Sequence, residues 1–276
     1  MRGLNLKIKL ITVLIILFVI VFSGCINFSE KSGPEVREYF ENEYIAENDT
    51  ILRITTTNGA ISVISWDGEN ITMNATKRSR HGYDDLDKAK IIVTEDNNEI
   101  NIEIQHDQPI RNRAVDLDIK IPKNVTLQSV TSTNGPIEIT NTKGDSVLTT
   151  TNGPIIAEGI DGYVKASSTN GGIDIKSTTG VDNLITTNGG ISAEIFDIIN
   201  DINIHTTNGG ITVYINSTIN ASIEISTING DIFVDTSLIS VTQESSKYLK
   251  GTIGSGGFKI DIQTTNGGIK VYKLVV

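Results

Sequence analysis

Apolar residues alternate with freely varying residues on both sides of a recurring Asn-Gly pair. Counted from each Asn, the residue four positions earlier is always apolar, and the residue three positions later is always Ile. The residue five positions later is apolar as well, whereas the one in between varies freely, as Ser62, Glu138 and Phe233 illustrate. A period of two is typical of strands with one buried face. Each copy of the pattern therefore predicts a strand, a corner at Asn-Gly and a second strand.

The pattern recurs along most of the chain. The Asn residues of its copies are Asn58, Asn134, Asn152, Asn170, Asn188, Asn208, Asn229 and Asn266. The invariant Ile residues are Ile61, Ile137, Ile155, Ile173, Ile191, Ile211, Ile232 and Ile269. Successive Asn residues are 76, 18, 18, 18, 20, 21 and 37 residues apart. A fixed period of this length indicates a repeat protein.

We predict an all-β fold, a β-solenoid (parallel β-helix) with coils of about 18–20 residues. Equivalent residues of neighbouring coils then lie about 4.8 Å apart, so the Ile residues form one core column. The gaps of 37 and 76 residues are close to two and four periods. The rhythm is therefore expected to continue through these gaps with the Asn-Gly marker lost.

The Asn-Gly pair is interpreted as the structural corner of each coil. Gly permits the positive φ angles that a sharp corner needs, and Asn tolerates them. Stacked Asn side chains can form a ladder of amides, as identical stacked strands often do. The alternative is that the Asn row binds a ligand.

Two segments interrupt the rhythm. Residues 64–130 are less regular and more charged: residues 91–104 predict a hairpin, and residues 77–90 predict a loop or a short helix. The basic residues of this region are interpreted as a solvated surface, with a binding loop as the alternative; they are Lys77, Arg78, Arg80, Arg111 and Arg113. The second interruption covers residues 235–257. The last strand is expected at the C-terminus, where an uncovered coil needs a cap or a partner.

The N-terminus has the composition of an export signal. Three basic residues precede the 13-residue apolar run from Leu10 to Phe22, and Ser23-Gly24-Cys25 follows. This order is typical of a secretory signal, and the run is short for a membrane-spanning helix. "VFSGC" resembles the lipobox of prokaryotic lipoproteins, with Phe22 where Leu is usual. The resemblance implies cleavage between Gly24 and Cys25 and a lipid on Cys25.

The expected domains follow from these segments. Residues 1–24 form the signal peptide, residues 25–37 a tether, and residues 38–276 the solenoid domain. The alternative is an uncleaved anchor that extends to about residue 26. Both readings place the protein in the cell membrane with its domain on the extracytoplasmic face.

Charge and the scarcity of catalytic groups narrow the possible functions. The residues after position 24 hold 33 acidic and 20 basic residues, a formal charge of −13. That charge repels nucleic acid and attracts cations or cationic peptides. The three histidines, His81, His106 and His205, lack metal-ligand spacing, and no nucleophile elbow occurs. We predict no metal, no cofactor and no catalytic residue.

The chain resembles a prokaryotic family of adhesin-like β-strand repeat proteins of unknown function. The resemblance covers roughly residues 38–276 and rests on "LRITTTNGAISV", on "DLDIKIPKNV" followed by "TSTNGPIEI", on the repeated "TTNGGI" and on the closing "GTIGSGGFKIDIQTTNGGIKVY". It implies a β-solenoid in a cell-envelope setting, and it implies no catalytic residues.

Three functions remain open at this point. The first is a lipid-anchored, non-catalytic binding, adhesion or structural module that contacts envelope polymers or surface proteins. The second is an envelope sensor that captures cationic ligands on its acidic surface. The third is a polysaccharide-active enzyme, since Glu138 and Asp174 are expected about 10 Å apart on one outer column. Exposed columns of Thr favour the module, and an acidic groove with paired, buried carboxylates favours the enzyme.

Overall fold

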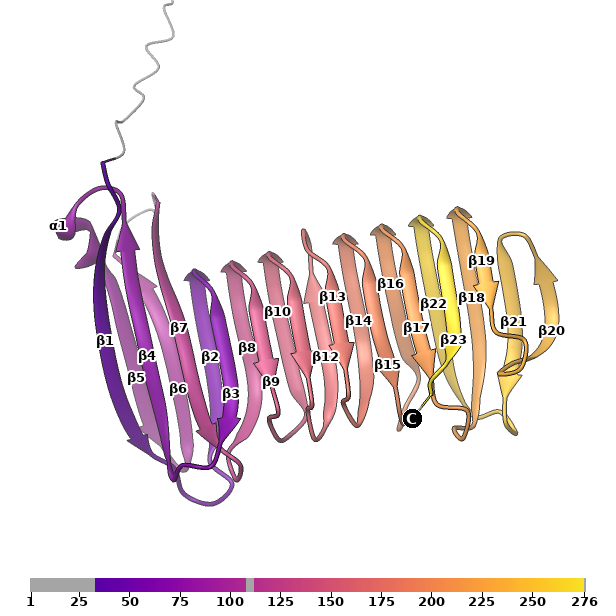
Figure 1. Ribbon diagram of the computed structural model, residues 1–276, viewed down its shortest axis with the longest axis horizontal. Helices are drawn as coiled ribbons and strands as arrows, with labels where there is room; N and C mark the ends of the chain where they lie inside the picture. Colours follow the sequence, from indigo (N-terminus) through magenta and orange to yellow (C-terminus); the bar gives the residue numbers. More distant parts are fainter. Residues whose placement is uncertain (1–32, 108–111, 276) are drawn as a thin grey trace, which may run out of the picture. The chain divides into compact units, whose positions relative to one another are not determined.

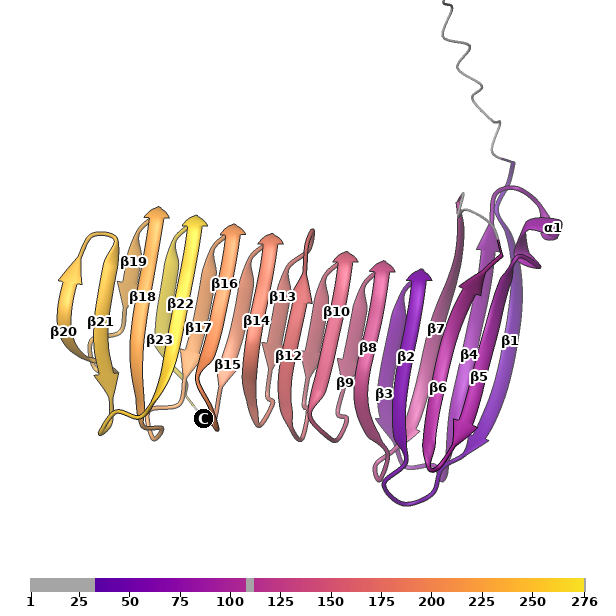
Figure 2. The same ribbon diagram turned by 180° about the vertical axis from the view of Figure 1, so that it is seen from behind.

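The computed structural model describes residues 33–107 and 112–275, within a compact unit that begins at Gly33. Two facing sheets make up this unit, one of 11 strands and one of 12, which we call sheet A and sheet B (Figures 1 and 2). The predicted signal peptide, with Gly24 and Cys25, lies outside the described residues. No helix within the described ranges is both long and apolar enough to cross a membrane.

Each coil contributes one strand to each sheet, and the Asn-Gly corner joins the two. In sheet B the coil strands are β2 (Ile51–Asn58), β8 (Thr126–Asn134), β10 (Ser146–Asn152), β12 (Tyr163–Ser168), β14 (Gly180–Asn188), β16 (Ile202–Asn208), β18 (Ala221–Asn229) and β22 (Phe258–Asn266). In sheet A they are β3 (Ile61–Trp66), β9 (Ile137–Thr140), β11 (Ile155–Glu158), β13 (Ile173–Lys176), β15 (Ile191–Ile195), β17 (Ile211–Ile215), β19 (Ile232–Val234) and β23 (Ile269–Lys273).

Neighbouring coils pair in parallel and in register, which confirms the predicted all-β solenoid. Ile173 of β13 pairs with Ile155 of β11 on one side and with Ile191 of β15 on the other. Seven residues of the Ile column are at most 2% exposed, and Ile232 on the edge strand β19 is half-buried. The alternation of the sequence therefore directs one apolar face of each sheet into a common core.

The gap of 76 residues does not contain further coils, so the expected continuation of the rhythm is wrong there. Asn58 pairs directly with Asn134, and Ile61 pairs with Ile137. The intervening residues fold instead into an N-terminal cap. Its strands are β4 (Asn70–Ser79), β5 (Ala89–Asp96), β6 (Glu99–His106) and β7 (Arg113–Pro122), together with β1 (Val36–Ile45), which begins two residues before the expected boundary at residue 38.

The gap of 37 residues is also not two coils, and the C-terminal strand is not the last of the stack. The coil of Asn266 lies between those of Asn208 and Asn229, with β22 between β16 and β18 and β23 between β17 and β19. The intervening segment forms an antiparallel hairpin, β20 (Ser240–Ser245) and β21 (Tyr248–Ile253), which extends sheet B beyond β18. The cap expected for the final coil therefore comes from the chain itself.

The reason for glycine at the corners differs from the expectation. Among the eight corner glycines only Gly59 has a left-handed φ, of 135°. At the seven other corners, a Cβ would lie 1.8 to 2.2 Å from the corner carbonyl oxygen of a neighbouring coil. Glycine is needed at these corners because the backbones of stacked coils approach too closely for any side chain.

The N-terminal cap buries an ion pair behind a short helix, α1 (Tyr83–Leu86). Arg113 is 1% exposed, and its Nη1 donates a hydrogen bond of 2.7 Å to Oδ1 of Asp85. The Ser79 hydroxyl donates to the other carboxylate oxygen at 2.7 Å. Burial raises the pKa of Asp85, but the hydrogen bond from Ser79 and the charges of Arg113 and Lys88 outweigh it and hold this pKa below its ordinary value.

His106 completes this buried group. Arg113 Nε donates to its Nδ1 at 3.2 Å, so the neutral ring carries its proton on Nε2. Burial lowers the pKa of His106, and the charge of Arg113 lowers it further. Protonation of His106 would place an N–H at Nδ1 opposite the N–H of Arg113 Nε, and it would add a positive charge beside the guanidinium. The cap therefore favours a neutral histidine.

Adjacent glycines at one corner test the close approach of the coils. Gly209→Ala places a Cβ 2.1 Å from the Gly189 carbonyl oxygen, whereas at Gly210 the nearest atom is 3.4 Å away. Overpacking of this kind should lower the free energy of unfolding by about 1–3 kcal/mol or more. Gly210→Ala should change it by no more than about 0.5 kcal/mol. Chemical denaturation measures both, and equal effects would contradict this account of the corner.

The cap should weaken in mild acid. Below about pH 6.5 the unfolded chain takes up a proton at position 106 while the folded chain does not, so the free energy of unfolding should fall with pH. His106→Asn keeps an acceptor for Arg113 and should remove the slope between about pH 5.5 and 7.5. The lowered pKa of Asp85 contributes stability that is lost only in more acidic solution. A slope in the mildly acidic range that persists in His106→Asn would refute the role of this ring.

Candidate binding surfaces

The corner Asn side chains form a ladder along the stack. Each amide Nδ2 donates to Oδ1 of the neighbouring Asn at 2.7 to 2.9 Å, and the bonds run in the order Asn229, Asn266, Asn208, Asn188, Asn170, Asn152 and Asn134. Asn134 donates to the Thr57 carbonyl oxygen, and Asn58 donates to that of Arg113. Except at Asn229, which only donates, one donor and one acceptor of each ladder amide are therefore used within the stack, which supports the structural role over a ligand-binding one.

A second ladder runs along the inside of the corner. The Ser or Thr two residues before each Asn is buried, and six of the eight donate a hydroxyl hydrogen bond to a corner glycine carbonyl of a neighbouring coil. The bond from Thr186 to Gly171 is 2.8 Å long. Because a buried hydroxyl needs a partner, this ladder accounts for Ser or Thr at six of the positions, whereas the hydroxyls of Thr56 and Ser132 have no partner among the described residues.

The outer face of sheet B carries two rows of mostly uncharged polar side chains. The residue before each Asn belongs to one row; in stack order the row holds Thr57, Thr133, Thr151, Thr169, Thr187, Thr207, Thr265 and Ile228. The residue three before each Asn belongs to the other; this row holds Thr55, Thr131, Thr149, Ser167, Ile185, His205, Gln263 and Ser226. All of these side chains are exposed or half-exposed.

The two rows make a regular grid of hydrogen-bonding groups. Parallel pairing sets the row spacing at about 4.8 Å between coils, and alternate residues of one strand are about 6.5 Å apart. Each hydroxyl can both donate and accept. One exposed column therefore holds Thr in seven of the eight coils, as expected of a binding module, and the other holds Thr or Ser in five. We call this surface the threonine face.

Three of the five residues of the predicted basic neighbourhood, Lys77, Arg78 and Arg113, are paired or buried within the cap, whereas Arg80 is exposed, as a solvated surface requires. Lys77 is buried, lies 4.5 Å from the Phe40 ring centroid and is 3.7 Å from a Glu38 carboxylate oxygen. Arg78 makes two hydrogen bonds, of 2.6 and 3.2 Å, with Asp116. Together with the buried Arg113, these cations neutralise carboxylates within the cap. Arg111 lies outside the described residues.

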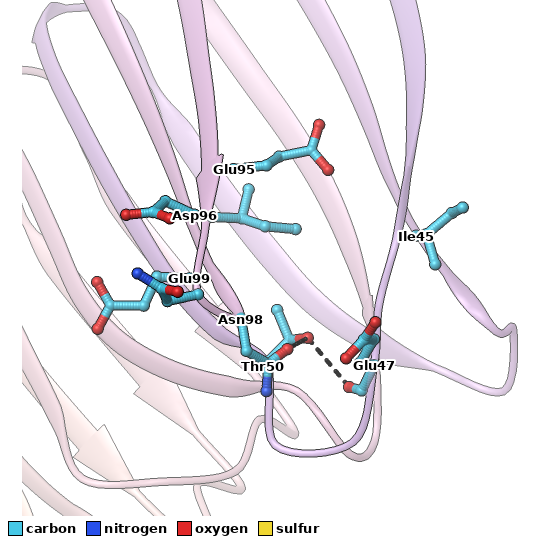
Figure 3. Close-up of a pocket in the computed structure, with 9 residues that line it drawn as sticks. Ile45, Glu47, Thr50, Glu95, Asp96, Asn98 and Glu99 are labelled. Atoms are coloured by element: carbon cyan, nitrogen blue, oxygen red, sulfur yellow. Dashed lines mark hydrogen bonds between the residues drawn. The ribbon is translucent and has the colours of Figure 1, made fainter.

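An acidic pocket lies at the N-terminal end of the molecule (Figure 3). Its volume is about 310 Å³, and it is lined by Ile45, Glu47, Thr50 and the 95–100 segment around the β5–β6 turn. This turn has left-handed φ angles of 48° at Asn97 and 65° at Asn98, as a tight hairpin requires. Figure 3 shows Glu95 extending toward the strand that carries Ile45.

The charges of the acidic pocket are only partly compensated. Arg53 donates to both carboxylate oxygens of Glu99, and this hydrogen bonding lowers the pKa of Glu99. Within the described ranges, no basic side chain lies within ion-pair distance of Glu47, Glu95 or Asp96. Burial raises the pKa of the nearby Tyr44 hydroxyl, and the charge of Glu95 adds to this effect. The pocket therefore presents a negative surface to an incoming cation.

The described residues contain no candidate metal site. Within residues 33–107 and 112–275, no group of three or more His, Cys, Asp or Glu residues could hold a metal ion. Glu138 and Asp174 lie two coils apart in the register of sheet A with Ile156 between them, as predicted, and Asp174 is paired with Lys176 at 2.7 Å. Sequence reasoning missed the acidic pocket because its two halves lie about 50 residues apart in the chain. The threonine face had a visible signal, because Thr stands directly before seven of the eight Asn-Gly pairs.

Comparison with known proteins gives a family and distant structural likenesses. No curated protein matches the chain. The crystal structure of a candidate cell adhesion protein from Clostridium sporogenes ATCC 15579 is similar at 12% identity and a TM-score of 0.37, covering 86% of this chain and 100% of that chain. That of a candidate adhesin from Bacteroides fragilis NCTC 9343 is similar at 12% identity and a TM-score of 0.39, covering 85% and 97%.

One further structure and the family model complete the comparison. The crystal structure of a candidate adhesin from Parabacteroides distasonis ATCC 8503 is similar at 9% identity and a TM-score of 0.39, covering 84% of this chain and 97% of that chain. The family model described as Toastrack DUF4097 matches residues 46–272, which include all eight Asn-Gly corners. The chain therefore belongs to the DUF4097 family of Toastrack domains.

Proposed function

We propose that the protein is a non-catalytic binding module of the cell envelope that holds a repeating polymer on its threonine face. The observation that carries the proposal is the register of this face, because the same two hydroxyl positions recur on the four successive coils of Asn58, Asn134, Asn152 and Asn170. A polymer with a regular repeat can meet such a grid at many points at once, so weak single contacts add up. The side chains of the grid are mostly uncharged, so a neutral polysaccharide suits it better than a polyanion.

The proposed setting is the outer side of the cytoplasmic membrane. The export signal and the lipobox-like "VFSGC" support a lipid on Cys25, with residues 25 to about 35 linking the lipid to β1. A tethered module with a long binding face can engage a polymer that lies parallel to the membrane.

A second candidate function is supported by the acidic pocket. Glu47, Glu95 and Asp96 line one cavity, and the domain carries a large negative charge, so a cationic ligand would be attracted to this end. This candidate corresponds to an envelope sensor. The dependence of affinity on salt distinguishes the two candidate functions. Binding of a cation by carboxylates weakens as salt is added, whereas hydrogen bonds to threonine hydroxyls do not depend on screening.

Substitution of the threonine face should weaken retention on the polymer. In the triple variant Thr151→Val, Thr169→Val and Thr187→Val, three hydroxyls are lost while shape and strand propensity are kept. Each hydrogen bond is worth about 0.5–1.5 kcal/mol, so affinity for purified cell-wall polysaccharide should fall roughly tenfold or more. Affinity electrophoresis of the full-length chain in neutral detergent measures this loss.

The opposite face of the molecule supplies the matched control. The triple variant Ser62→Ala, Ser192→Ala and Thr212→Val removes three hydroxyls from the outer face of sheet A and should leave retention unchanged. Equal losses in both triple variants, or no retention of the native protein on any neutral polysaccharide, would contradict a role for the threonine face.

The anchor is tested independently of the ligand. Cys25→Ala removes the proposed lipid attachment residue, so the protein should leave the membrane fraction or keep its signal peptide. Cell fractionation and mass measurement of the isolated protein report both outcomes. Unchanged mass and unchanged membrane partition would exclude lipidation at Cys25.

A further inference from the structure

The N-terminal end of the molecule leaves one edge of each sheet without a strand partner. Within the described ranges, β1 is the outermost strand of sheet A and β5 is the outermost strand of sheet B. A cavity of about 390 Å³ lies between them, lined mainly by residues of β1 and β5. The acidic pocket of about 310 Å³ lies farther along the same two strands. We call the two cavities together the end groove.

Apolar side chains from both strands form part of the floor of the end groove. Phe40 and Tyr44 of β1 and Ile91 and Val93 of β5 line the larger cavity and pack against the core while remaining partly exposed. Covering these side chains would remove apolar surface from water, at about 25 cal/mol per Å². The groove can therefore receive apolar side chains that point inward from an added chain.

The two edges differ in how they resist pairing with another strand. β1 carries Glu38, Glu41 and Glu43, and charged side chains on an edge strand discourage pairing. β5 has only uncharged residues from Ile91 to Thr94, of which Ile91, Ile92 and Val93 are half-exposed. Its free edge presents backbone donors and acceptors to an incoming strand. Of the two edges, β5 is the one suited to accept a partner.

Charge is distributed unevenly along the groove. The lysines at the Phe40 end are already paired, Lys77 with Glu38 at 3.7 Å and Lys90 with Asp107 at 2.6 Å. At the other end, Glu47, Glu95 and Asp96 have no basic partner within the described ranges. A ligand that brings a positive charge to this end gains attraction, while one that brings a negative charge is repelled.

We propose that the free edge of β5 binds an extended peptide as an additional strand of sheet B. Alternate apolar side chains of the peptide enter the end groove, and a lysine or arginine at one end of the peptide reaches Glu95 and Asp96. Strand addition supplies affinity through backbone hydrogen bonds, and the pocket supplies selectivity. This inference rests on the second candidate function and specifies its ligand, and it does not depend on the threonine face.

The experiment uses the full-length chain in neutral detergent and synthetic nine-residue peptides that alternate Val with Thr. Two Lys residues stand at the N-terminal end of one peptide and at the C-terminal end of another, so that both strand directions are covered. One of the two should bind and should slow hydrogen exchange of the β5 amides between Lys90 and Asp96. The same peptide with Glu in place of Lys should bind at least about tenfold more weakly at low salt.

Variants of the protein distinguish the effect of the pocket carboxylates on peptide binding from the effect of the overall negative charge. Glu95→Gln combined with Asp96→Asn should weaken the Lys peptide about tenfold at low salt and by less at high salt. Glu103→Gln is the matched control, because Glu103 is exposed on β6 and does not line either cavity. Polysaccharide retention should be the same in all of these variants, so failure of this inference and failure of the threonine face are distinguishable.

Several outcomes would overturn the inference. They are no peptide binding, equal binding of the Lys and Glu peptides, and binding without protection of β5. Protection of β5 without peptide that grows with protein concentration would identify a second copy as the occupant. The same protection at low concentration would identify another segment of the chain.

Discussion

The contact between corner glycines sets the distance between coils, and the rest of the structure depends on that distance. Each corner carbonyl lies where a Cβ of the next coil would be, so the backbones approach as closely as sheet pairing allows. Only then do the Asn amides and the buried Ser and Thr hydroxyls reach their partners in the adjacent coil. The Ile column and the threonine face are spaced by the same contact. The packing of the Ile column, the hydrogen bonds of the corner and the spacing of the threonine face therefore all follow from one distance between backbones.

The repeating part of the fold was largely predictable from the sequence, whereas the order of the coils was not. Strand, corner and strand follow from the alternation around Asn-Gly, because a period of two permits one assignment of faces. The position of the Asn266 coil between those of Asn208 and Asn229 does not follow, because all corners carry nearly the same residues. A pattern shared by every coil specifies how coils stack and not which coils are neighbours.

The two candidate binding surfaces also differ in how far the sequence predicts them. The threonine face arises from a local motif repeated in register, so its residues can be read from the sequence once the corner is recognised. The end groove depends on strands far apart in the chain, since β1 and β5 meet only after the 64–130 segment has folded over the first coil. The basic residues of the 64–130 segment show what composition alone does not predict. Composition identified Lys77 and Arg113 as a basic cluster, and only their burial showed that they stabilise the cap.

The late insertion of β22 and β23 has a consequence for how the molecule folds. Synthesis delivers the N-terminal coils first, and each of those up to Asn208 can stack on a neighbour that already exists. The coil of Asn229 cannot, because its neighbour is the last one made. That coil must wait, with β18 and β19 unpaired on the side toward the stack, until the chain is complete. The C-terminal end should therefore close in a single late step, and a chain that stops before residue 258 would lack the coil that separates β16 from β18 and β17 from β19.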